Sequence, residues 1–430
     1  MTTLKAVRGT RDLLPPETSL WNRIETTARQ VFARYNFGEI RTPIFEDTAL
    51  FARGVGEETD IVSKEMYTWE DRARAQSEKT QSLTLRPENT AGVVRAYIEH
   101  QLGETGQLQK LFYIGPQFRR ERPQKGRYRQ FSQIGAEVIG PPSAGSESPL
   151  RDAEVLEMLA TLLDELGITG WTLHLNSVGS AADRARYNEA LRAALVPVVD
   201  QMCVDCQRRA VTNPLRVLDC KVPADQPIID TLPVIADSLD EESKKHFAAV
   251  TAALDAAGVT YTRNPRLVRG LDYYTRTTFE FTHGGLGAQN ALLGGGRYDG
   301  LSEMLGGPRA PGIGFAMGED RLVLTLQALQ AAKPELADAF IAPLGETLNP
   351  AALALARELR RAGLHIELGE GNFRLKKSFE AADKTACRIV ILGEDELQSG
   401  ILTVKTFATG MQTKVNRAEL AAYLSTPVCE

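Results

Sequence analysis

The sequence predicts an α+β fold in which a mainly antiparallel sheet carries helices, interrupted by a helical insertion and followed by a separate α/β domain. The first supporting observation is a set of short extended segments, bounded by Gly, Pro, Asn or other polar residues, at 111–114, 173–175 and 277–281. The second is a change of texture between about 180 and 256, where charged, Ala-rich sequence favours helices. The third is an alternation of strand and helix patterns at the end of the chain.

The first helix is expected directly after Pro15-Pro16. Apolar residues such as Leu20, Ile24 and Val31 recur there near the 3.6-residue period, and Phe37-Gly38 ends the pattern. An ordinary amphipathic helix is therefore predicted at the start of the chain.

The last hundred residues indicate a domain of their own. An Ala-rich helix is expected over 327–337 and apolar strands over 340–344 and 389–392. Between these strands Asn349-Pro350 opens a helix that Gly363 ends. This alternation predicts a parallel sheet.

These signals divide the chain into two domains. We expect a first domain over 1–325, with the helical insertion over 180–256, and a second domain over 335–430. A length of 430 residues is ordinary for such an organisation.

The overall charge of the chain does not indicate a nucleic-acid partner. The chain has 50 Lys plus Arg against 55 Asp plus Glu, a formal net charge of -5, so any surface for nucleic acid must be local. The N-terminal sequence contains no apolar stretch long enough for a signal peptide or membrane span, which predicts a cytoplasmic protein with no membrane partner.

Three of the five cysteines are candidate metal ligands. Five cysteines, an odd number, suit a reducing compartment better than a disulfide framework. Cys203, Cys206 and Cys220 have the residue types of a structural metal site, but a fourth ligand is missing nearby in sequence, and His246 is the only obvious candidate. We therefore expect free thiols and no bound metal.

An arginine-rich segment carries the densest functional signal. Six cations and one anion fall between Phe118 and Phe131, with apolar strand sequence on both sides. A strand, a basic loop and a returning strand would present guanidinium groups at a sheet surface, where they match phosphate oxygens bidentately. The segment favours polyphosphate or nucleic acid over a merely solvated hairpin.

A glycine-rich segment follows later in the chain. Gly294-Gly295-Gly296 permits close approach of a ligand to the backbone, and Arg321 opens an expected helix from which it could reach a phosphate. Taken alone, a Gly run more often marks turns, which is the interpretation we favour for it. The chain contains neither a P-loop nor a convincing dinucleotide-binding motif.

Two weaker segments offer pocket residues. Arg269 would present a fixed positive charge beside Tyr273 and Tyr274, which by physics alone are as consistent with a core or interface as with a ligand. Glu88 and Thr90 at the end of an expected strand suit an ammonium group, although on their own they favour a helix N-cap.

Taken together and in this order, the segments resemble those of class II aminoacyl-tRNA synthetases. The arginine loop is similar to the second motif of that class, the Gly-rich run ending in Arg321 to the third, and 37–43 to the first, at the dimer interface. The segments 269–274 and 294–300 narrow the resemblance to the histidyl enzymes. The similarity spans nearly the whole chain and implies a class II catalytic domain with a C-terminal anticodon-binding domain.

The resemblance implies roles for residues on the ATP side. The counterpart of Arg119 holds the α-phosphate and that of Arg321 the γ-phosphate. Phe131 would stack on adenine and Arg127 would orient the triphosphate. ATP is then a substrate, with bound Mg²⁺ offsetting its charge.

The resemblance also implies a histidine pocket. Glu88, Thr90 and Gln133 would hold the α-amino group. Glu137 and Tyr274 would read the imidazole.

The remaining matched residues complete the implied reaction. Tyr273 lies beside the imidazole readers, and Arg269 matches an arginine that bridges the amino-acid carboxylate and the α-phosphate. These roles imply histidyl-adenylate formation, followed by transfer of histidine to the 3′ end of tRNA(His), by a homodimer. The runner-up is a non-catalytic synthetase-like regulator that binds histidine, and a third alternative is a class II enzyme for another amino acid.

Overall fold

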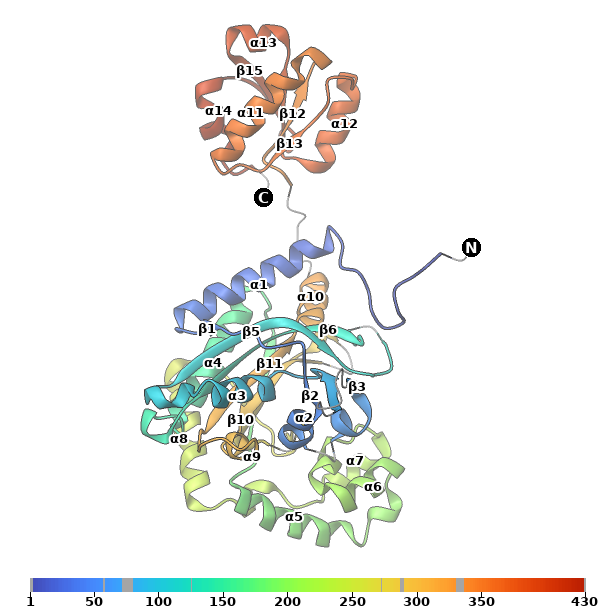
Figure 1. Ribbon diagram of the computed structural model, residues 1–430, viewed down its shortest axis with the longest axis vertical. Coiled ribbons are helices and arrows are strands. Elements are labelled where there is room, and N and C mark those ends of the chain that lie inside the picture. Colours follow the sequence, from blue (N-terminus) through green and yellow to red (C-terminus); the bar gives the residue numbers. More distant parts are fainter. Residues whose placement is uncertain are drawn as a thin grey trace. The chain divides into compact units, whose positions relative to one another are not determined.

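The computed structural model (Figure 1) describes residues 3–56, 59–71, 80–124, 126–271, 273–286, 290–329 and 336–428. The chain divides into two compact units, Met1–Ala332 and Lys333–Glu430. Among the helices so described, none is both long and apolar enough to cross a membrane.

The first unit is built on an eight-stranded sheet with the order β1-β5-β6-β11-β10-β9-β7-β8. Its strands are β1 (Gly38–Glu39), β5 (Gln109–Phe118), β6 (Gln130–Ile139), β7 (Trp171–Ser177), β8 (Thr262–Arg263), β9 (Thr275–His283), β10 (Ala291–Arg297) and β11 (Gly312–Gly318). The pairs β1–β5 and β7–β8 at the two edges are parallel, and the pairs between them are antiparallel. The predicted antiparallel sheet and its three predicted strands are confirmed.

One face of this sheet is covered by long helices. These are α1 (Glu17–Arg34), α4 (Pro149–Glu165), α8 (Glu241–Ala257) and α10 (Glu319–Ala328). Leu20, Ile24 and Val31 of α1 are buried against the strands, as the periodicity predicts. The apolar faces of helices and sheet close the main core, which leaves the opposite face of the central strands for the site.

Shorter elements lie on that opposite face. A three-stranded sheet is formed by β2 (Phe45–Asp47), β4 (Gln81–Leu85) and β3 (Tyr67–Asp71). The accompanying helices are α2 (Thr48–Val55), η1 (Ile61–Glu65), α3 (Thr90–Glu99), η2 (Leu102–Thr105) and α9 (Leu301–Met304). Helix α3 and the short helices η2 and α9 contribute to a second apolar cluster that contains Tyr273, Tyr274 and Tyr298. Two further short helices are η3 (Pro142–Ala144), which follows β6, and η8 (Gly284–Leu286), which contacts α10.

The insertion between β7 and β8 is helical and has its own core. Its elements are α5 (Ala181–Leu195), η4 (Val199–Gln201), α6 (Val204–Thr212), η5 (Pro214–Asp219), η6 (Pro223–Asp225), α7 (Gln226–Ile229) and η7 (Ile235–Ser238). Val250 and Leu254 of α8 pack in the main core instead, so the separately packed part of 180–256 ends before that helix.

His246, the only obvious fourth ligand in the sequence for a cysteine metal site, lies away from the three cysteines. His246 lies on α8, where its Nε2 is 3.6 Å from the Asp152 carboxylate, and it is not part of the cysteine cluster. The packing of α8 on α4 draws this side chain into the main body, which spacing along the chain does not reveal.

The second unit is an α/β domain with a five-stranded sheet of order β13-β12-β14-β15-β16. The strands are β12 (Ala339–Pro343), β13 (Ile366–Leu368), β14 (Arg388–Leu392), β15 (Ile401–Thr406) and β16 (Gln412–Asn416). The helices are η9 (Glu346–Leu348), α11 (Asn349–Arg361), α12 (Leu375–Thr385), α13 (Glu394–Ser399) and α14 (Arg417–Leu424).

Two expectations for this part of the chain need correction. The first three strands pair in parallel, but β14–β15 and β15–β16 are antiparallel, so the sheet is mixed. A tight turn at Gly410 (φ +69°) joins β15 to β16 and permits only an antiparallel pair. The helix expected over 327–337 is not found, because α10 ends at Ala328 and Ala337 bridges to Ala386, while 330–335 lie outside the described residues.

Candidate active site

A cavity over the central strands collects nearly all predicted site residues. Those that line it are Glu88, Thr90, Arg119, Arg127, Phe131, Gln133, Arg269, Tyr273, Tyr274 and Arg321. Glu137 is not in the lining and lies directly behind Thr90, whose Oγ1 donates to Glu137 Oε1 at 2.8 Å. Segments far apart in sequence therefore meet at one site.

Strand β6 supplies three of the predicted residues. Phe131, Gln133 and Glu137 are separated by even numbers of residues, so their side chains leave the same face of the sheet. Gln133 Oε1 is buried without a hydrogen-bond partner among the described residues. An unsatisfied buried acceptor in a cavity lining is suited to a ligand donor such as an ammonium group.

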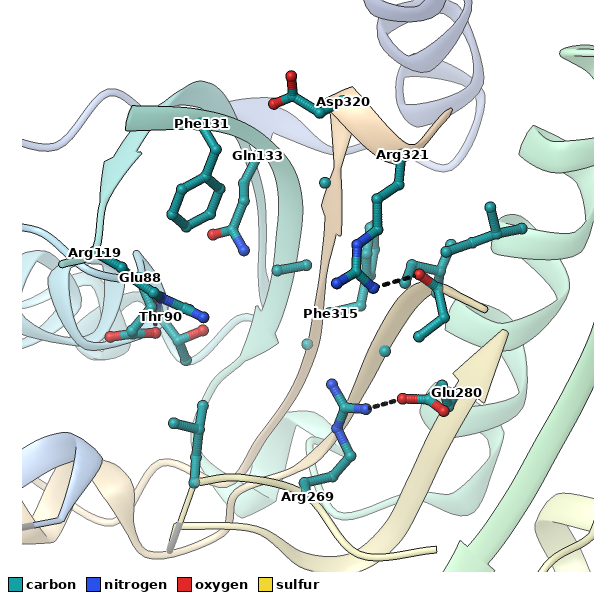
Figure 2. Close-up of a pocket in the computed structure, with 18 of the residues that line it drawn as sticks. Glu88, Thr90, Arg119, Phe131, Gln133, Arg269, Glu280, Phe315, Asp320 and Arg321 are labelled. Atoms are coloured by element: carbon teal, nitrogen blue, oxygen red, sulfur yellow. Dashed lines mark hydrogen bonds and ion pairs between the residues drawn. The ribbon is translucent and has the colours of Figure 1, made fainter. Parts of the chain in front are cut away.

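Three guanidinium groups approach the same space from separate elements (Figure 2). Arg119 follows β5, Arg269 precedes β9, and Arg321 lies in the first turn of α10. Arginine keeps its charge at any physiological pH and binds phosphate or carboxylate oxygens in pairs. The arrangement therefore suits a ligand that carries several anionic oxygens.

Arg119 is held in place from two sides. Its Nε donates to the Pro87 carbonyl at 2.9 Å, and its Cζ lies 5.3 Å from the Phe131 ring centroid. Glu121 links it to the loop, with an oxygen 3.9 Å from Arg119 and the other 3.1 Å from Arg127. The predicted strand–loop–strand thus places Arg119 beside the Phe131 ring and links it through Glu121 to Arg127.

Arg269 depends on Glu280, which sequence reasoning did not select, and on Gly294, which was selected only for the approach of a ligand. Its Nη1 donates to Glu280 Oε1 of β9 at 2.7 Å, and a Cβ at Gly294 would lie 2.5 Å from the same nitrogen. Burial alone would lower the pKa of Arg269, but Tyr274 and Glu280 raise it overall. Gly294 is therefore glycine to admit this side chain, and the Gly run forms the middle of β10. The favoured interpretation of that run as a turn was wrong.

Arg321 reaches the cavity from the start of α10. Its Nη1 donates to the Ala291 carbonyl at 2.6 Å. Burial lowers its pKa, and the nearby Arg127 lowers it further. Mutual repulsion between these guanidinium groups is relieved when an anion binds between them.

The acidic end of the cavity is built on the N-terminus of α3. The Glu88 carboxylate accepts from the Thr90 and Ala91 backbone N–H groups at 2.8 and 3.0 Å, so the predicted N-cap interpretation is confirmed. Burial raises the pKa of Glu88 against these hydrogen bonds. The same carboxylate still faces the cavity, and capping does not exclude ligand contact.

Glu137 is fully buried in a hydrogen-bonded position. It accepts from Thr90 Oγ1 at 2.8 Å and from Tyr298 Oη at 2.6 Å. A Cβ at Gly314 would lie 1.7 Å from its Oε2, so only glycine fits opposite it on β11. Burial raises the pKa of Glu137 to about 8, although both hydrogen bonds favour the ionised form.

The tyrosines are both core and cavity residues. Tyr273 and Tyr274 have ring centroids 4.8 Å apart, and Tyr298 meets Tyr273 edge-on at 5.9 Å. Burial raises the pKa of each of them, so the phenols remain hydroxyl donors. Tyr298 lies in the segment 294–300 and has no role implied by the resemblance, but its contact with Glu137 indicates one.

The site brings guanidinium, carboxyl and phenol groups together in one cavity. Such a site can bring an amino acid with a free carboxylate up to a nucleotide phosphate, with the charges on both offset in advance. An antiparallel sheet with this cavity on its open face defines a class II aminoacyl-tRNA synthetase.

Comparisons with known proteins narrow this class. The family model for histidyl-tRNA synthetase matches residues 9–322, and the model for an anticodon binding domain matches residues 338–426. The chain therefore belongs to the histidyl-tRNA synthetase family, and its activity is that of a histidine–tRNA ligase.

Individual relatives agree with the family models. The chain is 73% identical over 422 residues to a histidine–tRNA ligase of Koribacter versatilis, covering 98% of this chain and 96% of the relative. It is 57% identical to that of Solibacter usitatus, covering 98% and 99%. An apo histidyl-tRNA synthetase structure from S. aureus matches with a TM-score of 0.78 and 38% identity, covering 99% of this chain and 100% of that chain.

Proposed function

We propose that the cavity performs both steps of histidine ligation with the residues predicted from the sequence. The histidine carboxylate attacks the ATP α-phosphorus, which releases pyrophosphate, and the terminal adenosine hydroxyl of the tRNA then displaces AMP from histidyl-adenylate. The observation that carries this proposal is the convergence of Arg119, Arg269 and Arg321 on one cavity that Glu88 also lines.

On the nucleotide side, the proposal assigns one contact to each residue. Arg119 binds the α-phosphate and Phe131, 5.3 Å from its guanidinium carbon, stacks on adenine. Arg321 binds the γ-phosphate and Arg127 orients the triphosphate. Arg269 bridges the substrate carboxylate and the α-phosphate, which offsets the repulsion between two anions that must meet.

On the amino-acid side, Glu88, Thr90 and the unpaired Gln133 Oε1 hold the α-amino group. Glu137 and Tyr274 read the imidazole, and Tyr273 packs against Tyr274. A substrate without the imidazole could not make these hydrogen bonds and would be disfavoured by roughly 0.5–1.5 kcal/mol for each bond that is missing.

Magnesium fits the donor set of the cavity. The carboxylates of Glu121 and Glu280 line it beside the arginines, and oxygen donors together with nucleotide phosphates are the ligands that Mg²⁺ prefers. The ion would neutralise phosphate charge, while the named arginines position the reacting groups.

The second unit is proposed to read the anticodon of tRNA(His), as the match of residues 338–426 suggests. We also propose a cytoplasmic homodimer. Ile44 and Phe45, which follow the segment 37–43, are about half exposed, and Phe45 packs against the exposed Trp69. An exposed apolar group of this kind is typical of a subunit contact.

The central test is histidine-dependent exchange of pyrophosphate into ATP. Arg269→Ala should reduce the exchange rate roughly 100-fold or more, because one preorganised positive contact to the transition state is lost. Arg266→Ala is the matched control, since this arginine lies three residues away and pairs with Asp230 and Gln226 outside the cavity. It should retain nearly the parental rate.

The same assay addresses the alternatives. Tight histidine binding by the parent chain without any exchange would support the regulator. Exchange driven by a different amino acid in a panel of all twenty would support another specificity. Equal activity of Arg269→Ala and its control would remove Arg269 from the reaction.

A further inference from the structure

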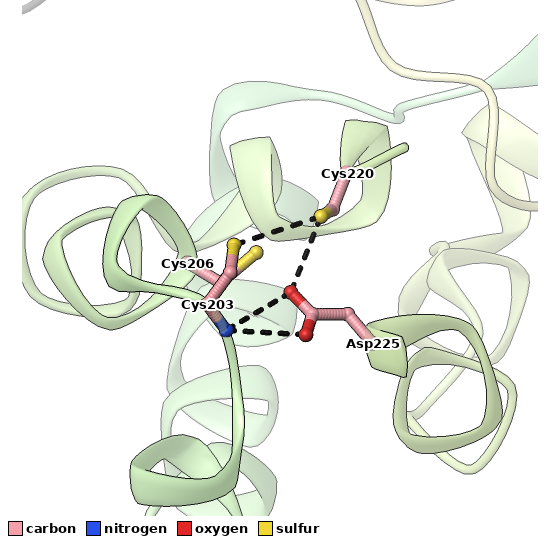
Figure 3. A group of neighbouring side chains, drawn as sticks. All are labelled: Cys203, Cys206, Cys220 and Asp225. Atoms are coloured by element: carbon pink, nitrogen blue, oxygen red, sulfur yellow. Dashed lines mark hydrogen bonds between the residues drawn. The ribbon is translucent and has the colours of Figure 1, made fainter. Parts of the chain in front are cut away.

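A cluster of metal-ligand side chains lies in the insertion, among elements that the ligation reaction does not use. Cys203 precedes α6, Cys206 lies in its first turn, Cys220 follows η5, and Asp225 ends η6 (Figure 3). The three sulfur atoms and one carboxylate oxygen lie within 4.8 Å of one another. Short elements that are separate in sequence thus bring four possible metal-ligand atoms close together.

The spacing is close to that of tetrahedral coordination. With zinc–sulfur bonds of about 2.3 Å, two ligand atoms of a tetrahedron are about 3.8 Å apart. Cys203 Sγ and Cys220 Sγ are 3.9 Å apart, and Cys220 Sγ is 3.3 Å from Asp225 Oδ2. Small side-chain rotations are enough to bring all four donors onto one ion.

The charge of Asp225 calls for a cation. Its side chain is 1% exposed, and within the described part of the chain no ion pair includes it. Both oxygens accept from the Cys203 backbone N–H, at 3.1 and 3.2 Å, which orients the carboxylate but does not neutralise it. A buried carboxylate among thiols is costly unless a positive charge accompanies it.

Two simpler explanations account for less. Cys206 and Cys220 pack in the core of the insertion, as apolar residues would, and the Cys220 thiol donates to Asp225, but a thiol supplies no positive charge to the buried carboxylate. The sulfur atoms of Cys203 and Cys220 are also well beyond the roughly 2.05 Å of a disulfide.

We propose that Cys203, Cys206, Cys220 and Asp225 bind one structural zinc ion. Each coordinating thiol releases its proton when the metal binds, and the thiolates of Cys203 and Cys206 lie at the positive N-terminus of α6. Four protein ligands leave no open position, so the ion is structural and not catalytic. The sequence favoured free thiols because Asp225 was not recognised as the fourth ligand.

The site explains how a small core is held together. Between Val199 and Ser238 the insertion consists of 3-10 helices and two short α-helices. Elements of this length bury little apolar surface and are commonly stapled by a metal or disulfides. Zinc would tie α6, η5 and η6 to one another.

The test begins with the full chain purified without chelator. We expect one zinc per chain by elemental analysis. After removal of the metal under reducing conditions, titration with Co²⁺ should give one equivalent of binding with thiolate-to-cobalt charge-transfer bands and the visible bands of tetrahedral coordination. Zinc should raise the melting temperature of the metal-free chain.

Variants separate coordination from packing. Cys220→Ser should lose the zinc, and Asp225→Asn, which can still accept from the Cys203 N–H, should weaken zinc affinity at least about tenfold. Asp205→Asn is the matched control, because this exposed aspartate stands between Cys203 and Cys206 and pairs with Arg208. It should keep the parental zinc content and affinity.

Either of two results would overturn the proposal. One is a parent chain that contains no zinc and gives no thiolate–cobalt bands. The other is equal zinc content and affinity in the parent, Cys220→Ser and Asp225→Asn, which would place the ion elsewhere. If Cys220→Ser does not fold, the cobalt spectrum of the parent and the comparison of Asp225→Asn with Asp205→Asn decide alone.

Discussion

Glu137 is a carboxyl group whose surroundings disfavour its own charge. It is fully buried on β6, and its pKa of about 8 places its titration near physiological pH. Below pH 4.5 it is protonated in both the folded and the unfolded chain. Between pH 4.5 and about 8 only the folded chain keeps the proton, so its contribution to stability is lost as pH rises through that window.

This linkage predicts a pH dependence that a neutral isostere removes. The free energy of unfolding of the parent, relative to Glu137→Gln, should fall between pH 6 and pH 8 by up to about 1.4 kcal/mol per pH unit. Urea unfolding at several pH values measures this difference, and other titrating groups cancel because both chains contain them. As a control, Glu99→Gln on the exposed end of α3 should show the same pH dependence of the free energy of unfolding as the parent. If Glu137→Gln also shows the same pH dependence as the parent, the Glu137 carboxyl is ionised throughout this range and the prediction is wrong.

At the scale of single residues, the sequence and the family motifs predicted the candidate site residues but not the side chains that these residues contact. Arg269, Glu88 and Glu137 stand in recognisable segments. Glu280, in contrast, meets Arg269 only because of the way β9 and the preceding loop pass each other. The proximity of Asp225 to the three cysteines could not be predicted for the same reason, since its short 3-10 helix shows no periodic pattern and its contact with Cys220 depends on the path of the chain.

Secondary elements are joined beneath the site by a buried ion pair. Asp152 of α4 accepts from Arg297 of β10 through Nε at 3.1 Å and through Nη2 at 2.5 Å. It also accepts from Thr277 Oγ1 of β9 at 2.6 Å. Both charged side chains are fully buried, so the pair fixes the helix against the two strands that present Gly294 and Glu280.

Removal of one partner should therefore be costly. Asp152→Ala leaves the buried Arg297 with the partly exposed Asp299 as its remaining carboxylate partner among the described residues, and we expect it to lower the free energy of unfolding by about 3 kcal/mol. Glu165→Ala, on the same helix as Asp152, breaks an exposed pair with Arg34 of α1 and should cost less than about 1 kcal/mol. Urea unfolding of both variants compares them directly, and similar small losses would show that the buried pair does not fasten α4.

Secondary elements were predicted correctly where a single local sequence pattern determines them. They were predicted wrongly where contacts with other parts of the fold determine the structure. The periodicity of α1 and the apolar runs of β5, β9 and β12 are local features, and each was confirmed. Strand β10 could not be predicted, because Gly294 to Gly296 have no side chains to show an alternation of buried and exposed positions. The antiparallel return of β16 depends on a single turn at Gly410, which a parallel α/β pattern hides.

The whole molecule consists of two units with separate apolar cores. One cluster contains Ile24, Leu156 and Phe315, and another contains Ile341, Leu355 and Val404. The residues that line the active-site cavity all belong to the first unit. Adenylate formation should therefore need only that unit, whereas recognition of a large tRNA gains from a second binding module.

Deletion of 333–430 tests this division of labour. The shortened chain should keep histidine-dependent pyrophosphate exchange within a few-fold of the parent. Its charging of tRNA(His) at low tRNA concentration should fall by roughly 10²–10⁴, the gain that linking two binding modules typically provides. Circular dichroism and thermal unfolding verify that the first unit remains folded. Since the loss arises from binding, it should diminish as the tRNA concentration is raised, whereas equal loss of exchange and charging would show that the second unit supports catalysis itself.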